Sequence, residues 1–268
     1  MSDFLGIARE RVYSPGKVAD DRAILDAVAA HLAERHDVAV LSADAPLPPR
    51  SPAPVVFAMC QGPAALAALR GWEADGVRVI NSVAGIENAH RHRMLAAFAA
   101  HGVAHPQSAI LATADAAALP AWVDGGAWLK RGDVHATDPD DVVRVADRAA
   151  ARAALAAFAR RGIAAACVQR HVDGEVIKFY AVRGGAFFAC FGADGAPPQL
   201  APRSAAALQR LAEAGAAALE LEVFGGDCVR DGDDGLWLID LNDWPSYGRC
   251  RSGSSAAIAS YVQQASPS

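Results

Sequence analysis

Residues 236–248, LWLIDLNDWPSYG, end a strongly apolar run with two oxygen-bearing side chains, Asp240 and Asn242. Side chains alternate between the two faces of a strand, so residues two positions apart share a face. Pro245 then stops the strand, because proline lacks the N–H that a sheet ladder needs. A carboxylate and an amide on one face at the end of an apolar strand predict a binding role for their oxygens.

A second strand is predicted just before it in the chain, at 223–231, and a turn bounded by glycines joins the two strands. In such a hairpin Asp227 lies beside Asp240. Two carboxylates and one amide oxygen in one patch suit Mg²⁺, which takes few protein ligands and keeps waters or phosphate oxygens. The alternative is that Asp240 and Asn242 are turn residues bonding their own backbone. Three such groups on one hairpin favour the metal.

Length and charge narrow the class of protein. The chain has 268 residues, enough for two or three lobes with their own cores, and a net charge of −5, which argues against a nucleic-acid partner. The first residues carry charges too early for a signal peptide, and no apolar run is long enough to cross a bilayer. Five widely spaced cysteines form no CxxC pair. We therefore expect a cytoplasmic protein with reduced thiols and no membrane partner.

The first 85 residues alternate between strand and helix patterns. The predicted strands are 4–8, 37–43, 54–60 and 77–81, and the predicted helices are 20–36 and 62–76. Strands that alternate with helices form a parallel sheet with helices on its faces. Residues 1–85 are therefore expected to form an α/β N-terminal lobe.

A small central lobe is expected over residues 86–165. It should contain a helix at 86–103 that ends at Gly102, a strand at 126–132 and one long helix at 138–162. A C-terminal lobe is expected over the rest of the chain, 166–268. Its elements are a predicted antiparallel meander at 164–172, 175–183 and 186–192, a helix at 202–221, the hairpin and a last helix. The predicted fold class is mixed α/β and α+β.

Lysine is rare in this chain and occurs at informative places. Only three of the 25 basic residues are lysines, namely Lys17, Lys130 and Lys178, and the last two lie on predicted strands. A solvated or snorkelling lysine is the ordinary reading of each. Two lysines opposite a metal-binding hairpin would instead form a nucleoside triphosphate site, because ammonium groups and metal together neutralise phosphate charge. The sequence has no GxxxxGK[ST] loop, GxGxxG, HExxH, GxSxG or protein-kinase motif.

Four segments match motifs of one known superfamily. They are GGDCV around Asp227, IDLN with Asp240 and Asn242, AWLK ending at Lys130, and CVQRHV at 167–172. On these segments the chain resembles the ATP-grasp superfamily over nearly its whole length. The resemblance implies an ATP-grasp fold, in which an α/β N-terminal lobe precedes a small central lobe and a C-terminal antiparallel-sheet lobe, with ATP between the last two.

The resemblance also implies cofactors and residue roles. The cofactors would be ATP and Mg²⁺, and the hairpin set of Asp227, Asp240 and Asn242 would supply the metal ligands. Lys130 would contact ATP phosphate. The hinge that reads adenine would include Gln169, Arg170 and His171.

Within the superfamily the chain resembles the inositol-phosphate kinases. Its metal motif is D-x-N, whereas carboxylate–amine ligases usually carry E-x-N, and EVIKFYAV resembles a kinase strand whose lysine, here Lys178, meets phosphate. The segment after Lys130 also lacks the glycine-rich loop of ligases. The chain departs from the pattern at 90–93, HRHR, where a phosphate-binding lysine is usual. Arg91 would take its place, although arginine and lysine bind phosphate differently.

Further basic residues are candidates for binding an anionic acceptor. Arg9 and Lys17 follow the first strand, where α/β lobes place ligand loops. Arg251 and Ser252 open the last helix, whose N-terminus suits an anion. An exposed basic loop and simple serine capping explain these residues equally well. His135, after Lys130, is a candidate for reaching the phosphates.

The leading hypothesis is an Mg-ATP-dependent enzyme that transfers the γ-phosphoryl group to an oxygen of a small anionic acceptor, such as a phosphorylated inositol. Lys178, Arg91 and His135 would be its catalytic residues, acting by positioning and charge neutralisation. One alternative is a carboxylate–amine ligase, in which an amine displaces an acyl phosphate. Another is a nucleotide-binding module without catalysis.

Overall fold

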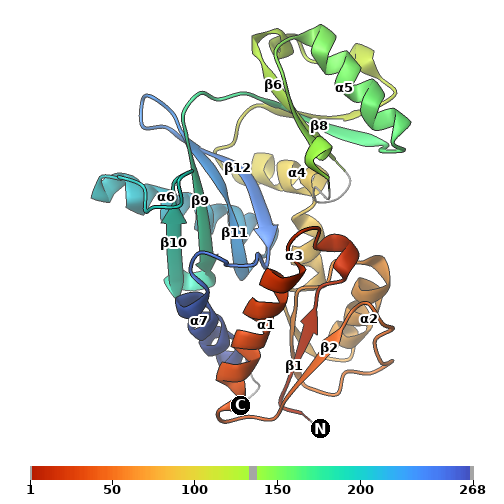
Figure 1. Ribbon diagram of the computed structural model, residues 1–268, viewed down its shortest axis with the longest axis vertical. Helices are drawn as coiled ribbons and strands as arrows, with labels where there is room; N and C mark the ends of the chain where they lie inside the picture. The colour runs from red at the N-terminus through yellow and green to blue at the C-terminus, as the bar shows by residue number, and fades with distance from the viewer. Residues whose placement is uncertain (1, 133–137, 266–268) are drawn as a thin grey trace.

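Three four-stranded sheets form the framework of the protein, and a computed structural model describes them through residues 2–132 and 138–265. Figure 1 shows an N-terminal lobe in red and orange, a small central lobe in green, and a C-terminal lobe in teal and blue. No helix of the described ranges is long and apolar enough to cross a membrane. The mixed α/β and α+β class predicted from the sequence is confirmed.

The N-terminal lobe is a parallel sheet with helices on both faces. Its order is β2-β1-β3-β4, and its strands are Phe4–Ala8 (β1), Val38–Ser42 (β2), Val55–Ala58 (β3) and Arg78–Ile80 (β4). Neighbouring residues of β1 face opposite sides of the sheet. Phe4 packs in one core with α1 (Val18–Ala33), and Leu5 packs in another with α2 (Pro63–Ala74). The predicted alternation of strands and helices is confirmed.

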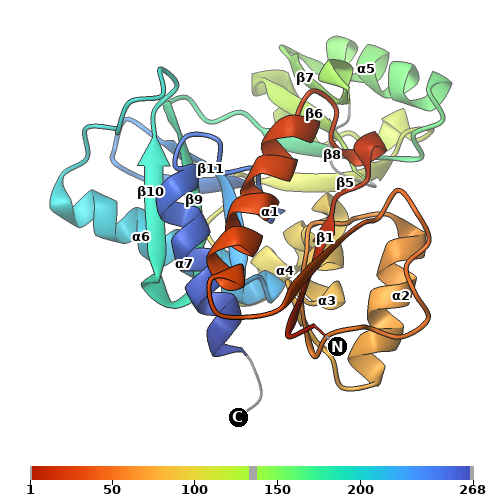
Figure 2. The same ribbon diagram turned by 60° about the horizontal axis from the view of Figure 1, so that its bottom comes forward.

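The N-terminal and C-terminal lobes share a hydrophobic core. α1 lies beside the last helix, α7 (Arg251–Gln264), in the views of Figures 1 and 2. The same core joins Phe57 of β3 to Trp244 and Tyr247, which follow the hairpin. The rings of Phe57 and Trp244 stack with 6.2 Å between their centroids. Burial of such large rings makes the two lobes one packed unit.

The central lobe is an antiparallel sheet of order β5-β8-β6-β7 packed against one helix. Its elements are Ser108–Ala112 (β5), Ala127–Arg131 (β6), Val142–Val145 (β7), Arg148–Arg160 (α5) and Ala165–Arg170 (β8). Leu155 and Phe158 of α5 pack in one core with Leu129 and Val168 of the sheet. This lobe has a core of its own, separate from the core that joins the other two.

The single helix predicted at 138–162 is wrong, because its first part forms β7. The valines of β7 are β-branched, which favours a strand, and they pair with β6. Asp147 then begins α5 by accepting a hydrogen bond from the Ala150 amide at 2.8 Å.

The helix predicted at 86–103 is two helices, α3 (Val83–Asn88) and α4 (Arg91–His101). His90 between them is extended, with φ −66° and ψ 134°. Gly102 adopts the left-handed conformation at φ 65° and ends α4 as predicted. The break places Arg91 in the first turn of α4, at the junction of the three lobes.

The C-terminal lobe is an antiparallel sheet of order β10-β9-β11-β12. Its elements are Glu175–Val182 (β9), Phe187–Phe191 (β10), Pro202–Leu219 (α6), Val223–Arg230 (β11) and Leu236–Asp243 (β12). The predicted meander is wrong in one respect, because β8 lies in the central sheet between β5 and β6 and does not pair with β9. Residues 171–174 therefore connect the two sheets as a hinge.

The predicted hairpin is confirmed and carries a bulge beside its acidic residues. Asp227 of β11 pairs with Asp240 of β12, whereas Cys228 pairs with Leu238. Ile239 is therefore the extra residue, and such a residue has no partner in the ladder. Its carbonyl accepts a hydrogen bond from Lys130 of the central lobe instead.

Candidate active site

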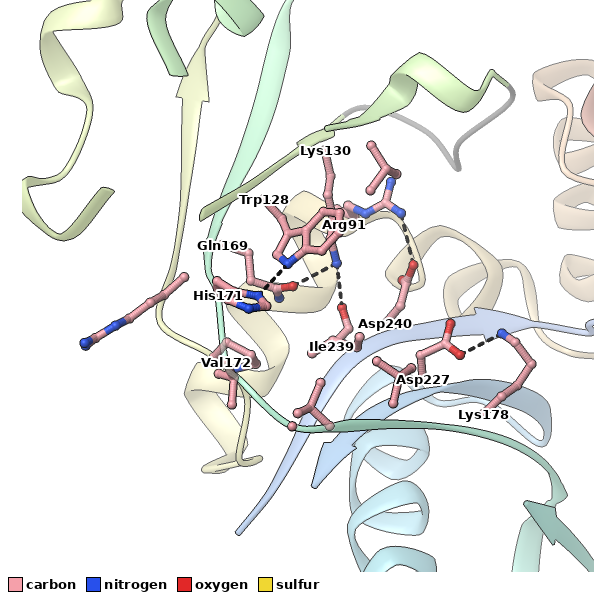
Figure 3. A pocket seen from close by; sticks show the side chains of 16 residues that line it. Arg91, Trp128, Lys130, Gln169, His171, Val172, Lys178, Asp227, Ile239 and Asp240 are labelled. Carbon is pink, nitrogen blue, oxygen red and sulfur yellow. Dashed lines mark hydrogen bonds and ion pairs between the residues drawn. The ribbon is translucent and has the colours of Figure 1, made fainter. Parts of the chain in front are cut away.

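A cavity of about 440 Å³ lies between the central and C-terminal sheets (Figure 3). Apolar atoms make up most of the exposed surface of its lining, and charged groups converge on it from both lobes. The charged residues are Arg91, Lys130, Arg170, Lys178, Asp227 and Asp240, and His171 also lines the cavity. A mostly apolar cavity with a few converging charges is typical of a site for a nucleotide-sized ligand.

The three predicted metal ligands lie on one face at the end of the hairpin. Asp227 and Asp240 are directly opposite each other, and Asn242 follows Asp240 on the same face. Leu241 between them is fully buried in the core of the C-terminal lobe. Anchoring of that side chain directs Asp240 and Asn242 to the opposite face, as the sequence predicts.

The chemistry of this donor set fits Mg²⁺. Within residues 2–132 and 138–265, no three histidine, cysteine, aspartate or glutamate side chains gather into a metal-binding group. An ion here would therefore rely on two carboxylates and the Asn242 amide oxygen, with water and phosphate oxygens as its other ligands. That is the ligand pattern of Mg²⁺ bound together with a nucleotide. The ion would neutralise charge on the phosphates of a bound nucleotide.

Lys130 projects from β6 into this cavity and is almost completely buried. Its ammonium group donates to Gln169 Oε1 at 2.8 Å and to the Ile239 carbonyl at 3.2 Å. Burial lowers the pKa of Lys130, with a contribution in the same direction from Arg91 and an opposing one from Asp240. A desolvated cation held by two neutral oxygens is suited to an anionic ligand such as a phosphate.

Arg91 connects the first turn of α4 to Asp240, one of the predicted metal ligands. Its Nη2 donates to Asp240 Oδ2 at 3.0 Å, and its Nη1 donates to the Arg131 carbonyl at 3.0 Å. The side chain is 5% exposed, and its buried Nε has no hydrogen-bond partner among the described residues. At the position where the family resemblance leads one to expect a lysine, Arg91 therefore places a cation at the acidic end of the cavity.

Lys178 occupies the matching place on the other carboxylate. It lies directly across from Asp227 on the paired strand, and its Nζ is 2.7 Å from Asp227 Oδ1. Burial lowers the pKa of Lys178, but the charge and hydrogen bond of Asp227, helped by Tyr180 and Asp240, raise it overall. Lys178 therefore stays charged at neutral pH.

The hinge wall of the cavity combines predicted and unpredicted residues. Trp128 Nε1 donates to His171 Nδ1 at 3.0 Å, and His171 Nε2 lies 2.9 Å from Asp173 Oδ1. Because Nδ1 accepts from the indole, the proton of a neutral His171 belongs on Nε2, where it bonds the carboxylate. Gln169 and Arg170 also line the cavity. The chain Trp128–His171–Asp173 fixes an aromatic wall on this side.

A second cavity of about 410 Å³ begins on the other side of Lys178. It lies between the N-terminal and C-terminal lobes, and Lys178 contributes to both cavities. Its lining includes Tyr13, Lys17, Gln61, Asn242 and Ser246. A second ligand bound there would lie next to the metal-binding end of the first cavity.

Arg9 lines the second cavity, but protein atoms already engage all of its nitrogens. Its Nε donates to the Met59 carbonyl at 2.9 Å, its Nη1 to Asp21 Oδ2 at 3.1 Å, and its Nη2 to the Trp244 carbonyl at 2.8 Å. Arg9 thus joins β1, α1 and the segment after β12. The side chain of Lys17, by contrast, is 64% exposed, and its Nζ forms a long ion pair of 3.7 Å with Asp20 Oδ2.

The other predicted binding residues lie apart from the two cavities. Arg251 Nη2 donates to Asp20 at 2.9 Å and so ties α7 to α1. Ser252 lies in the first turn of α7, where its carbonyl accepts from the Ser255 hydroxyl at 3.1 Å. Neither residue is among those that line the cavities described above. His135, a predicted catalytic residue, lies outside the described residues.

The sequence analysis missed several residues of the site. Trp128 lines the first cavity and Gln61 the second, and Glu10 holds the backbone at Gln61 by accepting from the Gln61 and Gly62 amides at 3.1 and 2.9 Å. Trp128 carried a usable signal, because it precedes Lys130 by two positions and must share its face of β6. Gln61 and Glu10 carried none, since their roles depend on contacts between distant segments.

The architecture matches known proteins although the sequence alone does not. No protein-family model matches the chain, and no curated protein matches its sequence. A RimK domain ATP-grasp protein from Sphaerobacter thermophilus has a TM-score of 0.71 at 20% identity, covering 97% of this chain and 99% of that one. D-alanyl-alanine synthetase A from Vibrio cholerae has a TM-score of 0.73 at 12% identity, covering 98% of both chains.

A D-alanine–D-alanine ligase from Bacillus anthracis has a TM-score of 0.75 at 10% identity, covering 99% of this chain and 97% of that one. The matches cover nearly the whole of this chain and of each of the three others. The chain therefore has the ATP-grasp fold, as its motifs imply.

Proposed function

We propose that the protein is an ATP-dependent carboxylate–amine ligase. Such an enzyme activates a carboxylate as an acyl phosphate and then forms an amide bond to an amine. The sequence analysis placed this activity second, behind phosphoryl transfer to a phosphorylated polyol. The charge of the second cavity is the observation that leads us to rank the ligase ahead of the kinase.

The second cavity is poorly suited to a phosphate-rich acceptor. Its described lining has three cations, Arg9, Lys17 and Lys178. Arg9 is committed to Asp21 and two carbonyls, and Lys178 is paired with Asp227. An inositol carrying several phosphates would need several available cations, because each phosphate brings up to two negative charges. A small carboxylic acid needs only one or two.

Two carboxylates, Asp21 and Asp243, also line this cavity and lower its net positive charge further, and neutral hydrogen-bonding groups lie between the charges. The neutral groups belong to Tyr13, Ser14, Gln61, Asn242 and Ser246. Such groups suit the amide, amine and carboxyl groups of amino acids or their derivatives. The names of the structural neighbours agree, since two of them are a synthetase and a ligase that join alanines. We therefore assign the second cavity to the carboxylate and the amine.

The reaction divides into two steps that the geometry can serve. A carboxylate oxygen attacks the γ-phosphorus of ATP, the bond to the β-phosphate oxygen breaks, and ADP leaves. The amine nitrogen then attacks the acyl carbon, inorganic phosphate leaves, and the amine gives up a proton. Lys130, Arg91 and Lys178 would position the phosphates, while Mg²⁺, when bound, would neutralise the transferred group.

Trapping with hydroxylamine tests this proposal. Purified protein is incubated with ATP, Mg²⁺ and a panel of amino acids and short peptides, and hydroxylamine replaces the amine. We expect a hydroxamate, detected as its iron complex, together with ADP and inorganic phosphate in equal amounts. ADP formed with a stable phosphate ester and without inorganic phosphate would favour the kinase. ATP binding without ADP formation on any acceptor would favour a non-catalytic module.

A further inference from the structure

The two acidic metal ligands each already hold a cation of the protein. Lys178 of β9 contacts Asp227 at 2.7 Å, and Arg91 of α4 contacts Asp240 at 3.0 Å (Figure 3). Two carboxylates and two cations give a patch with no net charge. Mg²⁺ arriving alone would gain the carboxylates only by drawing them from these cations, or by binding beside two positive charges.

Both cations also line the nucleotide cavity, where phosphates would offer them new partners. Arg91 has a donor in reserve, because its buried Nε has no hydrogen-bond partner among the described residues. Its Nη1 is held by the Arg131 carbonyl at 3.0 Å. The guanidinium can therefore turn from carboxylate to phosphate about an anchored end, without leaving the site.

We propose that Lys178 and Arg91 act as exchangeable counter-ions, which give up the carboxylates to Mg²⁺ and take up phosphate when a nucleotide binds. Before binding they keep Asp227 and Asp240 paired and in place. After binding they help to hold the nucleotide. The inference rests on the proposed use of a nucleoside triphosphate, but not on the identity of the acceptor.

The exchange makes binding of metal and nucleotide interdependent. Without nucleotide the two cations compete with the metal, whereas with nucleotide they are drawn away from it. Linkage requires that each ligand raises the affinity of the other by the same factor, and couplings of this kind are commonly about 5- to 150-fold. Coordination of metal by phosphate also produces coupling, so wild-type protein alone does not test the exchange.

Removal of a competing cation separates the two explanations. If Lys178 competes, Lys178→Met strengthens metal binding in the absence of nucleotide and weakens nucleotide binding. If Lys178 only contacts phosphate, the same change leaves metal binding without nucleotide as it was. Lys178 is suited to this test because its side chain is 40% exposed, so its replacement disturbs little packing.

The strand pair supplies a matched control. Arg230 of β11 pairs with Glu175 of β9 at 2.6 Å, in the same two-strand ladder and three positions from Asp227 and Lys178. Arg230 does not line the nucleotide cavity. Arg93→Met is the control for Arg91→Met, because Arg93 lies on the same helix and pairs with Glu87. Neither control variant removes a cation from the metal ligands.

The experiment uses Mn²⁺ as the probe, and electron paramagnetic resonance measures the free ion with and without a non-hydrolysable ATP analogue. For Lys178→Met we expect Mn²⁺ affinity without nucleotide to rise at least about 5-fold, coupling to fall, and analogue affinity to fall. Arg91→Met should act in the same direction, with circular dichroism as the check that it folds. Arg230→Met and Arg93→Met should match wild type.

Unchanged or weaker Mn²⁺ binding by Lys178→Met without nucleotide would overturn the exchange, even if Arg91→Met fails to fold. That result would leave the proposed ligase activity intact, provided that the wild type still binds the analogue. Failure of the wild-type protein to bind the analogue at any Mn²⁺ concentration would contradict both the exchange and the proposed function.

Discussion

Asn81 at the end of the N-terminal sheet forms hydrogen bonds in both directions with Val223 at the start of β11. Its Nδ2 donates to the Val223 carbonyl at 2.8 Å, and its Oδ1 accepts from the Val223 amide at 2.9 Å. Oδ1 also accepts from the Glu222 amide at 2.8 Å. This fully buried contact, with the core behind α1 and α7, joins the two lobes that enclose the second cavity.

Asn81→Ala should therefore reduce stability strongly. The change leaves the Glu222 and Val223 amides without their partner, while the Val223 carbonyl keeps the bond from the Trp244 amide at 3.0 Å. A buried polar group without a partner costs about 1–3 kcal/mol. We expect a loss of about 3 kcal/mol or more in the free energy of unfolding, measured with urea. Asn88→Ala is the control, since its single bond to the Leu219 carbonyl is 3.4 Å long. Equal losses in the two variants would argue against Asn81 as the main link.

Arg9 and Lys17 should differ in their effects, although both were predicted to bind substrate. Arg9→Met removes three bonds that join β1, α1 and the segment after β12, so it should cost about 2–3 kcal/mol of stability. Lys17→Met should change stability by less than about 0.5 kcal/mol, because it is exposed. We expect it instead to raise KM for the carboxylate. Thermal denaturation and steady-state kinetics of both variants make the comparison, and the reverse pattern would contradict our description of the cavity.

Asp240→Asn should abolish turnover and also destabilise the protein. Turnover requires a carboxylate for the metal, and the change removes one of two. The amide also leaves the buried guanidinium of Arg91 without its counter-charge, which should cost about 2 kcal/mol. Combining Asp240→Asn with Arg91→Met should restore part of that stability but no turnover. Full turnover in folded Asp240→Asn protein would remove Asp240 from the metal site.

Nucleotide affinity should fall as the pH rises, and the fall should begin at a lower pH than it would for a lysine with an ordinary pKa. Burial lowers the pKa of Lys130 below its usual 10.5, so this cation is lost early as the pH rises. The effect of Lys130 on stability runs in the opposite direction. Between its lowered pKa and the usual lysine pKa, the unfolded chain binds more protons than the folded one, so the contribution of this group to the free energy of unfolding rises with pH. Fluorescence titrations with nucleotide from neutral pH up to the usual lysine pKa of 10.5 should show the fall in wild type. In Lys130→Met the affinity should be low throughout and lack this component, and an unchanged pH profile would exclude Lys130 as its source.

Trp128 should report nucleotide binding directly. It lines the nucleotide cavity, whereas Trp72 and Trp244 are buried in other cores. We expect tryptophan emission to change when nucleotide binds and most of that change to disappear in Trp128→Phe. Calorimetry on the same variant shows whether binding persists. A full fluorescence change in Trp128→Phe would place the nucleotide elsewhere.

Local patterns in the sequence were enough to predict the acidic hairpin and the parallel N-terminal sheet. Asp227 and Asp240 lie on two strands joined by a short turn, and in the N-terminal lobe helices follow β1 and β3, while β2 leads directly to β3. The partner of Lys130 was not predictable, because the Ile239 carbonyl becomes available only through a bulge in β12. The place of β8 was likewise missed, since its neighbours β5 and β6 are chosen by tertiary packing.

The structural role of Arg9 illustrates the same limit. Its position after β1 suggested a ligand loop, and only the folded chain brings the Met59 and Trp244 carbonyls to it. Sequence reasoning singled out Lys130, Lys178 and the acidic hairpin, which lie around one cavity, but it did not show which charged residues the protein neutralises internally. That distinction moved the proposed acceptor from a phosphorylated polyol to a carboxylate.

Transfer of oxygen from the acceptor tests the central proposal most directly. An acid that supports ADP formation is prepared with ¹⁸O in its carboxylate and incubated with ATP, Mg²⁺ and an amine, and the released phosphate is analysed by mass spectrometry. Attack of the carboxylate on the γ-phosphorus predicts one ¹⁸O atom in each inorganic phosphate formed. Unlabelled phosphate, or phosphate retained on the acceptor as a stable ester, would contradict a ligase that acts through an acyl phosphate.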